Sequence, residues 1–441
     1  MVGKASLMLV MGFSLIFLIF GQRFNSLSNQ AVDNMVDYYS ENIAYECASA
    51  GAKMAASKLF FDNNWRTGFN NLSFNGGTIN VTVTGGAVLT VTSTGTFTNS
   101  LNKTTTYRDV IKCEQGVFSR YAYYSTMENS GSGKSSDIIW WTGNDTVWGP
   151  FHTQDYLYAY NHPVFKGKAT TKQSYVLYDY YNKYPSQLPQ NPSGGRETRD
   201  YNRSKSSDLP VFDGGYQGAT DLPLPTDGLD LLKTAAKDDG LDLTQTSSTD
   251  TIYITFMVDS VLIRRGYAQP STTYKTSEIA PNGVIYAEGM DVRLKGTVSG
   301  KYSVVSDGNI YLDDNIVYSK NPETDPHCTD LLGIVAQNNV YISENTANNS
   351  SININAAIYC QTGGFGAENY KTRPFSGYIN LIGGITQYQR QPVGTFGGHS
   401  DTGFYKRYKY DERLYDKISP PYYPSTKKFL VLSWLEEKVN D

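Results

Sequence analysis

The sequence predicts an α+β protein: a long N-terminal helix that packs on a small antiparallel sheet, followed by a large β-rich domain. Three observations carry this prediction. Residues 5–59 are first uniformly apolar and then show helical spacing, residues 72–113 alternate between apolar and polar, and short apolar segments recur from Gly283 onward. We therefore divide the chain into a helix, a sheet, a β-rich domain with repeat units and a closing segment, at residues 1–64, 65–117, 118–409 and 410–441.

The composition excludes some classes of protein. The chain of 441 residues has 38 Lys and Arg against 42 Asp and Glu, a formal net charge of −4. This balance provides no basic surface of the kind that binds nucleic acid. Aromatic residues make up 13% of the chain, which argues against disorder because disordered segments contain few of them. Abundant Gly and Tyr with few charges favour a location outside the cytoplasm.

Residues 5–21 contain no charged side chain and form the one strongly apolar run of the sequence. As a helix they span about 26 Å, close to the roughly 30 Å hydrocarbon core of a bilayer. Ten Leu, Ile, Phe or Val residues favour insertion by about 3–6 kcal/mol. The run therefore predicts one membrane helix. The alternative is a cleaved signal peptide. Two features argue against it: Lys4 is the single positive charge before the apolar run, and no small-x-small cleavage site follows Gly21.

The helical character continues beyond the apolar run. Residues 25–59 contain no Pro and one Gly, Gly51, and the helix is expected to end near residues 60–64. Apolar residues recur in this stretch in helical steps, at Leu27, Val32, Met35, Val36, Tyr39, Ile43, Cys47, Ala50 and Met54. The sequence thus predicts one continuous helix whose first half is apolar on all sides and whose second half is amphipathic.

A sheet is predicted directly after this helix. Residues 79–83, 88–92 and 107–111 alternate between β-branched or apolar residues and polar ones. Gly76-Gly77 and Gly85-Gly86 lie between apolar segments, where a turn needs positive φ. Alternation of this kind is typical of an antiparallel sheet with one covered face. We expect that face to lie on the amphipathic half of the helix.

A weak internal repeat begins at Gly283. Its units are short apolar segments about 20–30 residues apart, most of them preceded by Gly or Asn: residues 283–286, 308–312, 339–342, 357–360 and 377–381. Strands that recur in this way bury a face when they stack as rungs of a β-solenoid. An ordinary sandwich of similar strands is the alternative. Both interpretations predict a β-rich domain.

Several segments resemble type IV pilins, and most nearly the large PilX-like accessory pilins. The matching segments are Gly3–Val10 and the Ala-rich Glu46–Ala52 at the N-terminus, Gly149–Thr153 with Asn161–Phe165 in the middle, and Pro420–Pro424 near the C-terminus. The resemblance touches both ends and the middle of the chain. It implies a pilin-type helix packed on the sheet.

The resemblance also implies processing. A prepilin peptidase would cut after Gly3 and leave Lys4 as the first residue of the mature protein. Residues 1–3 lack the basic residues usual in pilin leaders, so we expect either a misassigned start codon or unusual processing. Met8 stands at the fifth mature position, where most major pilins carry glutamate; PilX-like members often lack it. The pilus assembly machinery is a further implied partner.

The apolar helix has a physical consequence for assembly. Once it leaves the membrane it must be covered, and copies of itself provide that cover. We expect a structural subunit of an extracellular filament at the cell surface, held in the inner membrane before assembly, with no catalysis and no cofactor. The residues expected to pack in the filament core are Ala5, Leu7, Leu9, Val10, Gly12, Phe13, Leu15, Ile16, Phe17 and Phe20.

Two other functions stay open at this point. The first is a minor pilin or tip adhesin that enters filaments sparsely. The second is a membrane-tethered, carbohydrate-active β-helix protein. It would need carboxylates or cations clustered on one face, whereas the repeat units offer mostly Tyr, Asn and Gly.

Four cysteines allow two disulfides. Cys47 on the helix with Cys113 on the sheet is one candidate pair, and Cys328 with Cys360 between repeat units is the other; free buried thiols are the alternative.

The sequence lacks the C-x-x-C or H-x-x-x-H spacing of a zinc site, so we expect no metal. The four histidines are scattered, which argues against catalytic cysteine chemistry.

Overall fold

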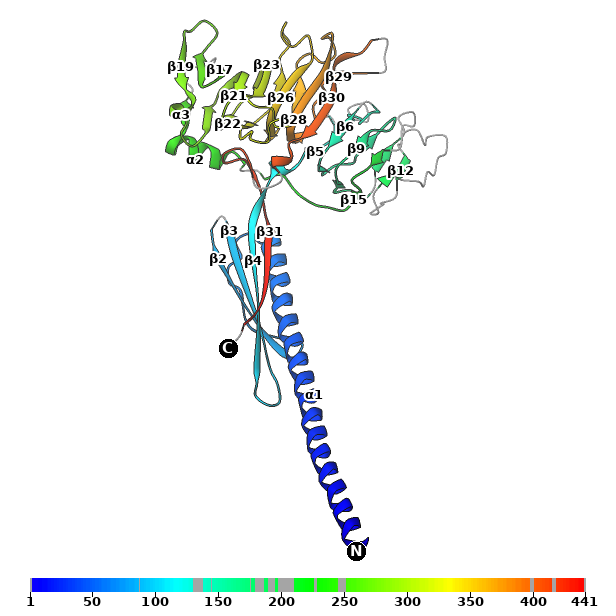
Figure 1. Ribbon diagram of the computed structural model, residues 1–441. Coiled ribbons are helices and arrows are strands. Elements are labelled where there is room, and N and C mark those ends of the chain that lie inside the picture. The colour runs from blue at the N-terminus through cyan, green and yellow to red at the C-terminus, as the bar shows by residue number, and fades with distance from the viewer. Residues whose placement is uncertain are drawn as a thin grey trace. The chain divides into compact units, whose positions relative to one another are not determined.

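A computed structural model describes residues 2–86, 88–129, 138–143, 145–174, 176–178, 186–188, 195–196, 210–225, 228–244, 251–396, 400–414 and 418–439. The chain is an α+β protein with a long apolar N-terminal helix and a large β-rich region (Figure 1). It divides into two compact units. Unit 1 consists of residues 1–116 and 427–441, and unit 2 of residues 117–426.

Unit 1 combines one helix with one sheet. The helix is α1, Val2–Phe61, as the apolar and amphipathic stretches predicted. The five strands of the sheet lie in the order β1 (Phe69–Phe74), β2 (Gly77–Gly85), β3 (Val88–Thr98), β4 (Thr104–Val117) and β31 (Ser425–Val439). The first four strands pair antiparallel in sequence order, which confirms the three strands expected from the alternation of Thr and Val.

Small residues bring α1 close to the sheet. Ala44, Ala48 and Ala52 are fully buried on the helix. Gly95 on β3 lies opposite them, where an added Cβ would be 2.2 Å from the Ala44 carbonyl oxygen. The Ser93 hydroxyl donates a hydrogen bond of 2.7 Å to the carbonyl oxygen of Ala48. The second half of the helix is therefore held on the sheet by close packing, over a core that includes Ile79, Val81, Leu89, Val91, Ile111 and Phe429.

The fifth strand comes from the far end of the chain. Trp434 on β31 donates its indole N–H to Asp109 Oδ2 on β4, at 3.1 Å, and Arg108 Nη1 lies 3.1 Å from Glu437 Oε1. The residue numbers of the contacting side chains decrease along β4 while they increase along β31, so the two strands run antiparallel. The sequence analysis treated residues 410–441 as one closing segment and did not predict this strand.

Asp109 makes the stability of unit 1 dependent on pH. Its side chain is fully buried, and burial together with the nearby charge of Glu436 raises its pKa to about 6. The folded protein therefore holds this proton more tightly than the unfolded chain, so stability falls as pH rises from about 4 to about 6. We expect Asp109→Asn, which keeps an acceptor for Trp434, to stabilise unit 1 by about 1–3 kcal/mol at pH 7 and by almost nothing at pH 4.

Urea unfolding followed by tryptophan fluorescence at the two pH values measures this difference. Asp37→Asn is the matched control, because the Asp37 carboxylate is exposed beside Lys103. The control variant should show no stabilisation at pH 7. Equal stability of wild type and Asp109→Asn at pH 7 would contradict the expected burial of the charge.

Unit 2 is built from short strands with few helices. The helices are α2 (Asp230–Asp239), α3 (Thr276–Ile279) and the 3-10 turns η1 (Phe118–Arg120) and η4 (Glu412–Leu414). The strands are β5 (Tyr123–Met127), β6 (Thr146–Trp148), β7 (Phe151–Thr153), β8 (Tyr158–Ala159), β9 (Val164–Phe165), β10 (Ala169–Thr171), β11 (Val176–Tyr178), β12 (Ser186–Leu188), β13 (Gly195–Arg196), β14 (Val211–Phe212), β15 (Tyr216–Gln217), β16 (Leu241–Thr244), β17 (Thr251–Val258), β18 (Ser260–Arg265), β19 (Ser271–Lys275), β20 (Val284–Glu288), β21 (Asp291–Val298), β22 (Lys301–Ser306), β23 (Ile310–Tyr318), β24 (Leu331–Ala336), β25 (Val340–Ile342), β26 (Ile352–Cys360), β27 (Phe365–Ala367), β28 (Phe375–Gln389), β29 (Gly394–Thr395) and β30 (Thr402–Tyr410).

Most of these strands stack in two parallel ladders. Ladder 1 runs through β16, β20, β22, β24, β26, β28, β5, β7, β10 and β15. Ladder 2 runs through β17, β21, β23, β26, β28, β30, β6, β9 and β14. The long strands β26 and β28 belong to both. Four of the five predicted repeat units lie in these ladders, at β20, β23, β26 and β28, and the fifth, β25, pairs parallel with β23 beside them.

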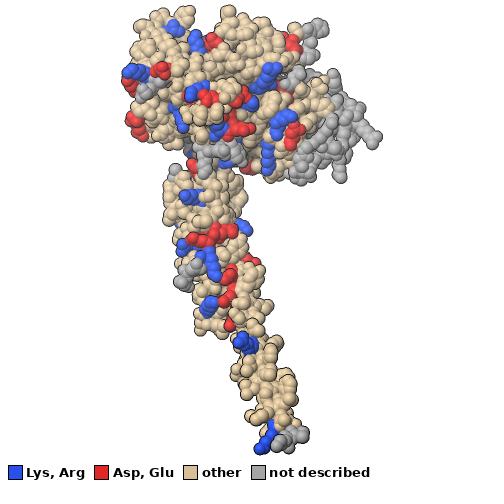
Figure 2. Space-filling view, viewed as in Figure 1, with Lys and Arg blue, Asp and Glu red and all other residues tan. Residues whose placement is uncertain are grey.

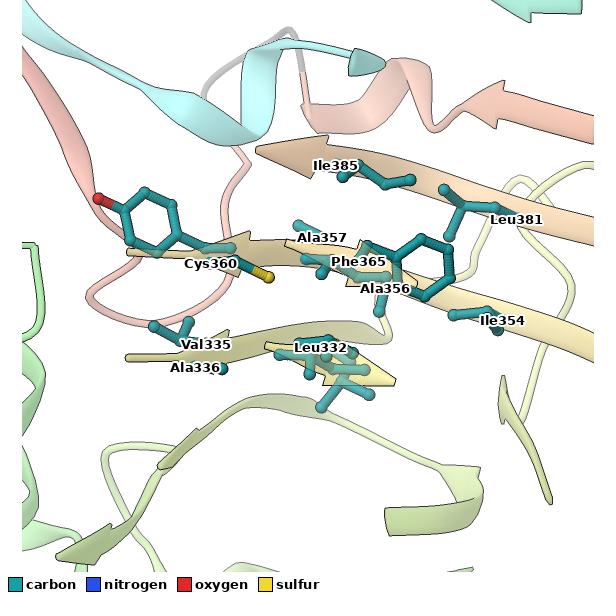
Figure 3. Packing of buried hydrophobic residues seen from close by; sticks show 14 of the residues in the cluster. Leu332, Val335, Ala336, Ile354, Ala356, Ala357, Cys360, Phe365, Leu381 and Ile385 are labelled. Carbon is teal, nitrogen blue, oxygen red and sulfur yellow. The ribbon is translucent and has the colours of Figure 1, made fainter. Parts of the chain in front are cut away.

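The interior of the stack is filled by aliphatic side chains in register. Leu332, Ile354 and Leu381 come from three different strands and are almost completely buried. Figure 3 shows them near Phe365 and Ile385, with side chains of neighbouring strands lying over one another. Strands β23 and β30 of ladder 2 alternate such inward residues with outward ones, and the outward residues include Asp313, Arg407 and Lys409.

Candidate functional site

The first half of α1 is exposed in the part of the chain that the structure describes. Every described side chain from Gly3 to Met35 is exposed. Within residues 5–21, twelve large apolar side chains have exposed fractions of 49–77%: Leu7, Met8, Leu9, Val10, Met11, Phe13, Leu15, Ile16, Phe17, Leu18, Ile19 and Phe20. We call residues 5–21 the apolar segment. Figure 2 shows how sparse charged side chains are along this end of the helix.

The structure places all of the predicted assembly residues in this exposed stretch. Gly3 and Lys4 lie in the first turns of α1, and the ten expected packing residues lie in the apolar segment. A Cβ added at Gly12 or Gly21 would meet no atom of the chain within 4 Å. Both glycines therefore leave room for close approach of another helix.

The apolar segment is unstable in water. Full burial of twelve such side chains is worth about 1.5–3 kcal/mol each, on the order of 20–30 kcal/mol in total. Among the residues that the structure describes, α1 is the one helix long and apolar enough to cross a membrane, with a mean hydropathy of 2.0 over 18 residues. A helix that is apolar all round needs a lipid or protein environment.

The cysteines do not form the two candidate disulfides. All four are buried free thiols. Cys47 faces Gly77 on β2, whereas Cys113 lies on β4, with β3 between the two strands. Cys328 lies beside Lys320 and Arg413, whereas Cys360 pairs in ladder 1 with Ala336 and Gln387. In each candidate pair, the two thiols therefore have different neighbours. Burial also raises the pKa of the Cys360 thiol.

A buried group of charges in unit 2 was missed by the sequence analysis. Arg390 Nη1 lies 2.8 Å from Glu128 Oε2, and their side chains are 3% and 0% exposed. Trp141 donates its indole N–H to the same carboxylate oxygen at 3.0 Å, and its ring lies 4.0 Å from the Arg390 guanidinium. Tyr123 donates its hydroxyl to Glu128 Oε1 at 2.8 Å. We call these residues the Glu128–Arg390 cluster.

A second buried ion pair lies next to this cluster. Lys406 Nζ is 2.8 Å from Asp145 Oδ2, and its ammonium is 5.6 Å from the centre of the Trp141 ring. Burial lowers the pKa of Lys406, while Asp145 opposes that shift. Both pairs are enclosed by aromatic rings and closed to solvent, so their role is structural.

The histidine of the pilin-like Gly149–Thr153 segment is also structural. His152 is fully buried and stacks on Tyr124, with ring centres 5.3 Å apart. Its Nδ1 lies 2.8 Å from Thr170 Oγ1. Burial lowers its pKa to about 4, so the ring is neutral at pH 7. A neutral, enclosed imidazole fixes the packing between β7 and β10.

No family model, curated protein or solved structure matches this chain. The candidate site therefore rests on its own geometry, with the exposed apolar segment as its main feature.

Proposed function

We propose that this chain is a structural subunit of a type IV pilus-like extracellular filament, in which the apolar segments of many copies form the core. Before assembly, the same segment would hold each copy in the inner membrane. One observation carries the proposal: the apolar segment exposes twelve large apolar side chains, none of which lies in a buried core of the described residues.

The arrangement of α1 supports a role in polymerisation. The second half of the helix is fixed on its sheet, so the first half projects as a helical extension of a folded unit. Met8 is uncharged, so the register between neighbouring helices would depend on packing alone. Gly12 and Gly21 would permit the close contacts that such packing needs. The resemblance of residues 3–10 to mature pilin N-termini agrees with this role.

For unit 2 we propose a β-solenoid. The support is the two ladders of parallel strands, in which successive strands lie directly over one another with aliphatic side chains inside. In a filament this unit would form part of the outer surface.

Filaments from the source cells provide the test. Mass spectrometry of purified filaments should identify this chain as a main component whose N-terminal peptide begins at Lys4. Antibodies against unit 2 should label filaments along their length. Labelling confined to filament ends would favour the tip adhesin, and a chain found only in membranes without filaments would contradict the proposal.

The second candidate is a membrane-tethered carbohydrate-binding protein. The outward face of ladder 2, with its polar groove, is the observation that favours it. A chain that remains in the membrane fraction and binds glycans would support this alternative.

A further inference from the structure

A groove of about 650 Å³ crosses the outward face of ladder 2. Its floor comes from five successive strands, β23, β26, β28, β30 and β6, which are neighbours in the ladder. The lining residues that matter below are Asn353, Asn380, Arg407, Lys409, Glu323 and Trp148. Because strands in a sheet are about 4.8 Å apart, five strands present a track of roughly 19 Å for a linear ligand.

The strand register arranges these residues in two rows along the track. In the first row, Asn353 pairs with Asn380, and Asn380 pairs with Arg407. In the second row, Ile382 pairs with Lys409, and Lys409 pairs with Trp148. Parallel pairing thus places amides and cations side by side, at regular spacing, over several strands. The track runs across the strands, along the direction of stacking.

The amides form a ladder that leaves donors for a ligand. Asn353 Nδ2 donates to Asn315 Oδ1 at 3.0 Å, and Asn380 Nδ2 donates to Asn353 Oδ1 at 3.1 Å. A side-chain amide nitrogen carries two hydrogens. One is used within the ladder, and among the residues that the structure describes the second has no acceptor, so it is left for hydroxyl groups in the groove. The hydrogen bonds between the amides also hold them in fixed positions.

The two cations of the groove, Lys409 and Arg407, have different interaction partners. Lys409 forms an ion pair with Glu323. Arg407 instead lies over the Tyr378 ring, with its guanidinium carbon 3.5 Å from the ring centre. Among the residues that the structure describes, no carboxylate pairs with Arg407. Its planar fork of N–H groups is therefore available for a carboxylate or sulfate from a ligand, which it can bind with two hydrogen bonds.

An exposed aromatic ring completes the track. Trp148 is 38% exposed at the end of the second row. A sugar ring has an apolar C–H face and carries hydroxyl groups along its edge. An indole can therefore cover the C–H face while amides bind the hydroxyl groups. A further groove of about 750 Å³ lies on β17, β18 and β21, beside β23. Its lining includes Arg264, Lys295 and the Arg293–Asp313 ion pair.

We propose that the outward face of ladder 2 binds a linear acidic oligosaccharide. Arg407 binds a carboxylate or sulfate of the glycan, the ladder of Asn353 and Asn380 binds its hydroxyls, and Trp148 stacks on a sugar ring. This binding site is independent of the apolar segment and holds whether or not the chain forms filaments.

The test uses the full chain in a polyoxyethylene detergent, which contains no sugar. Tetragalacturonate, a hyaluronan tetrasaccharide and a heparin tetrasaccharide serve as acidic probes, with maltotetraose as the neutral probe. Calorimetry should detect saturable binding of at least one acidic probe, weakened by added salt. We expect Arg407→Gln to weaken that binding at least tenfold and Trp148→Ala to weaken it as well.

Lys301→Gln is the matched control, since Lys301 is an exposed cation of ladder 1 that does not line the groove. It should bind the acidic probe as well as the wild type does. Arg407 is exposed, so Arg407→Gln should keep the wild-type unfolding temperature. Failure of all three acidic probes to bind would overturn the proposal. So would undiminished binding by Arg407→Gln, or equal binding of maltotetraose.

Discussion

A chain that lacks residues 5–20 is expected to be a soluble, folded monomer that forms no filaments. Every deleted residue is exposed and none belongs to the described core of unit 1, so the core of unit 1 and unit 2 keep their contacts. The driving force for membrane insertion and for helix association disappears with the apolar side chains. Analytical ultracentrifugation without detergent and electron microscopy measure both outcomes.

Point substitutions provide a sharper form of the same prediction. Leu9→Asp with Phe17→Asp adds two charges to the apolar segment, each costing about 2.5–3.5 kcal/mol at the centre of a membrane helix. Ser26→Asp with Asn29→Asp adds the same charges to the exposed polar part of α1. We expect the first variant to lose membrane insertion and filaments and the second to keep both. Filaments made by the deletion variant would rule out the apolar segment as the filament core.

The parts of the fold that were predictable from sequence depend on local patterns. The apolar segment is contiguous, and the alternation that identifies β2, β3 and β4 extends over a few residues each. Such patterns are visible in a single sequence because burial repeats with the period of the element. The exposed apolar segment was predictable for the same reason, since its residues are neighbours in the chain.

The parts that were missed depend on contacts between distant residues. Strand β31 joins β4 although more than 300 residues separate them, and β5 stacks on β28 across about 260 residues. The register that places Asn380 beside Arg407 is equally non-local. No spacing in the sequence reports such pairs. The cysteines illustrate the same limit, because an even number of thiols says nothing about their neighbours.

Replacing Arg390 by Met is expected to destabilise unit 2 by about 3–5 kcal/mol. The substitution removes the ion-pair partner of the fully buried Glu128 carboxylate, which keeps the hydrogen bonds donated by Trp141, Tyr123 and Ser125. Removing one partner of a buried ion pair costs this much because the remaining charge is far from water. Urea unfolding followed by near-UV circular dichroism measures the loss.

The double variant Glu128→Gln with Arg390→Met separates the charge from the packing. The double variant removes both charges and leaves no unpaired charge in the interior. Its free energy of unfolding should therefore be higher than that of Arg390→Met alone, because an unpaired buried charge destabilises more than the loss of the whole pair. Lys166→Met is the matched control on the exposed Lys166–Asp213 pair and should cost less than about 1 kcal/mol. If Arg390→Met were as mild as this control, water would have to reach Glu128, and the cluster would be an open polar site instead of a structural one.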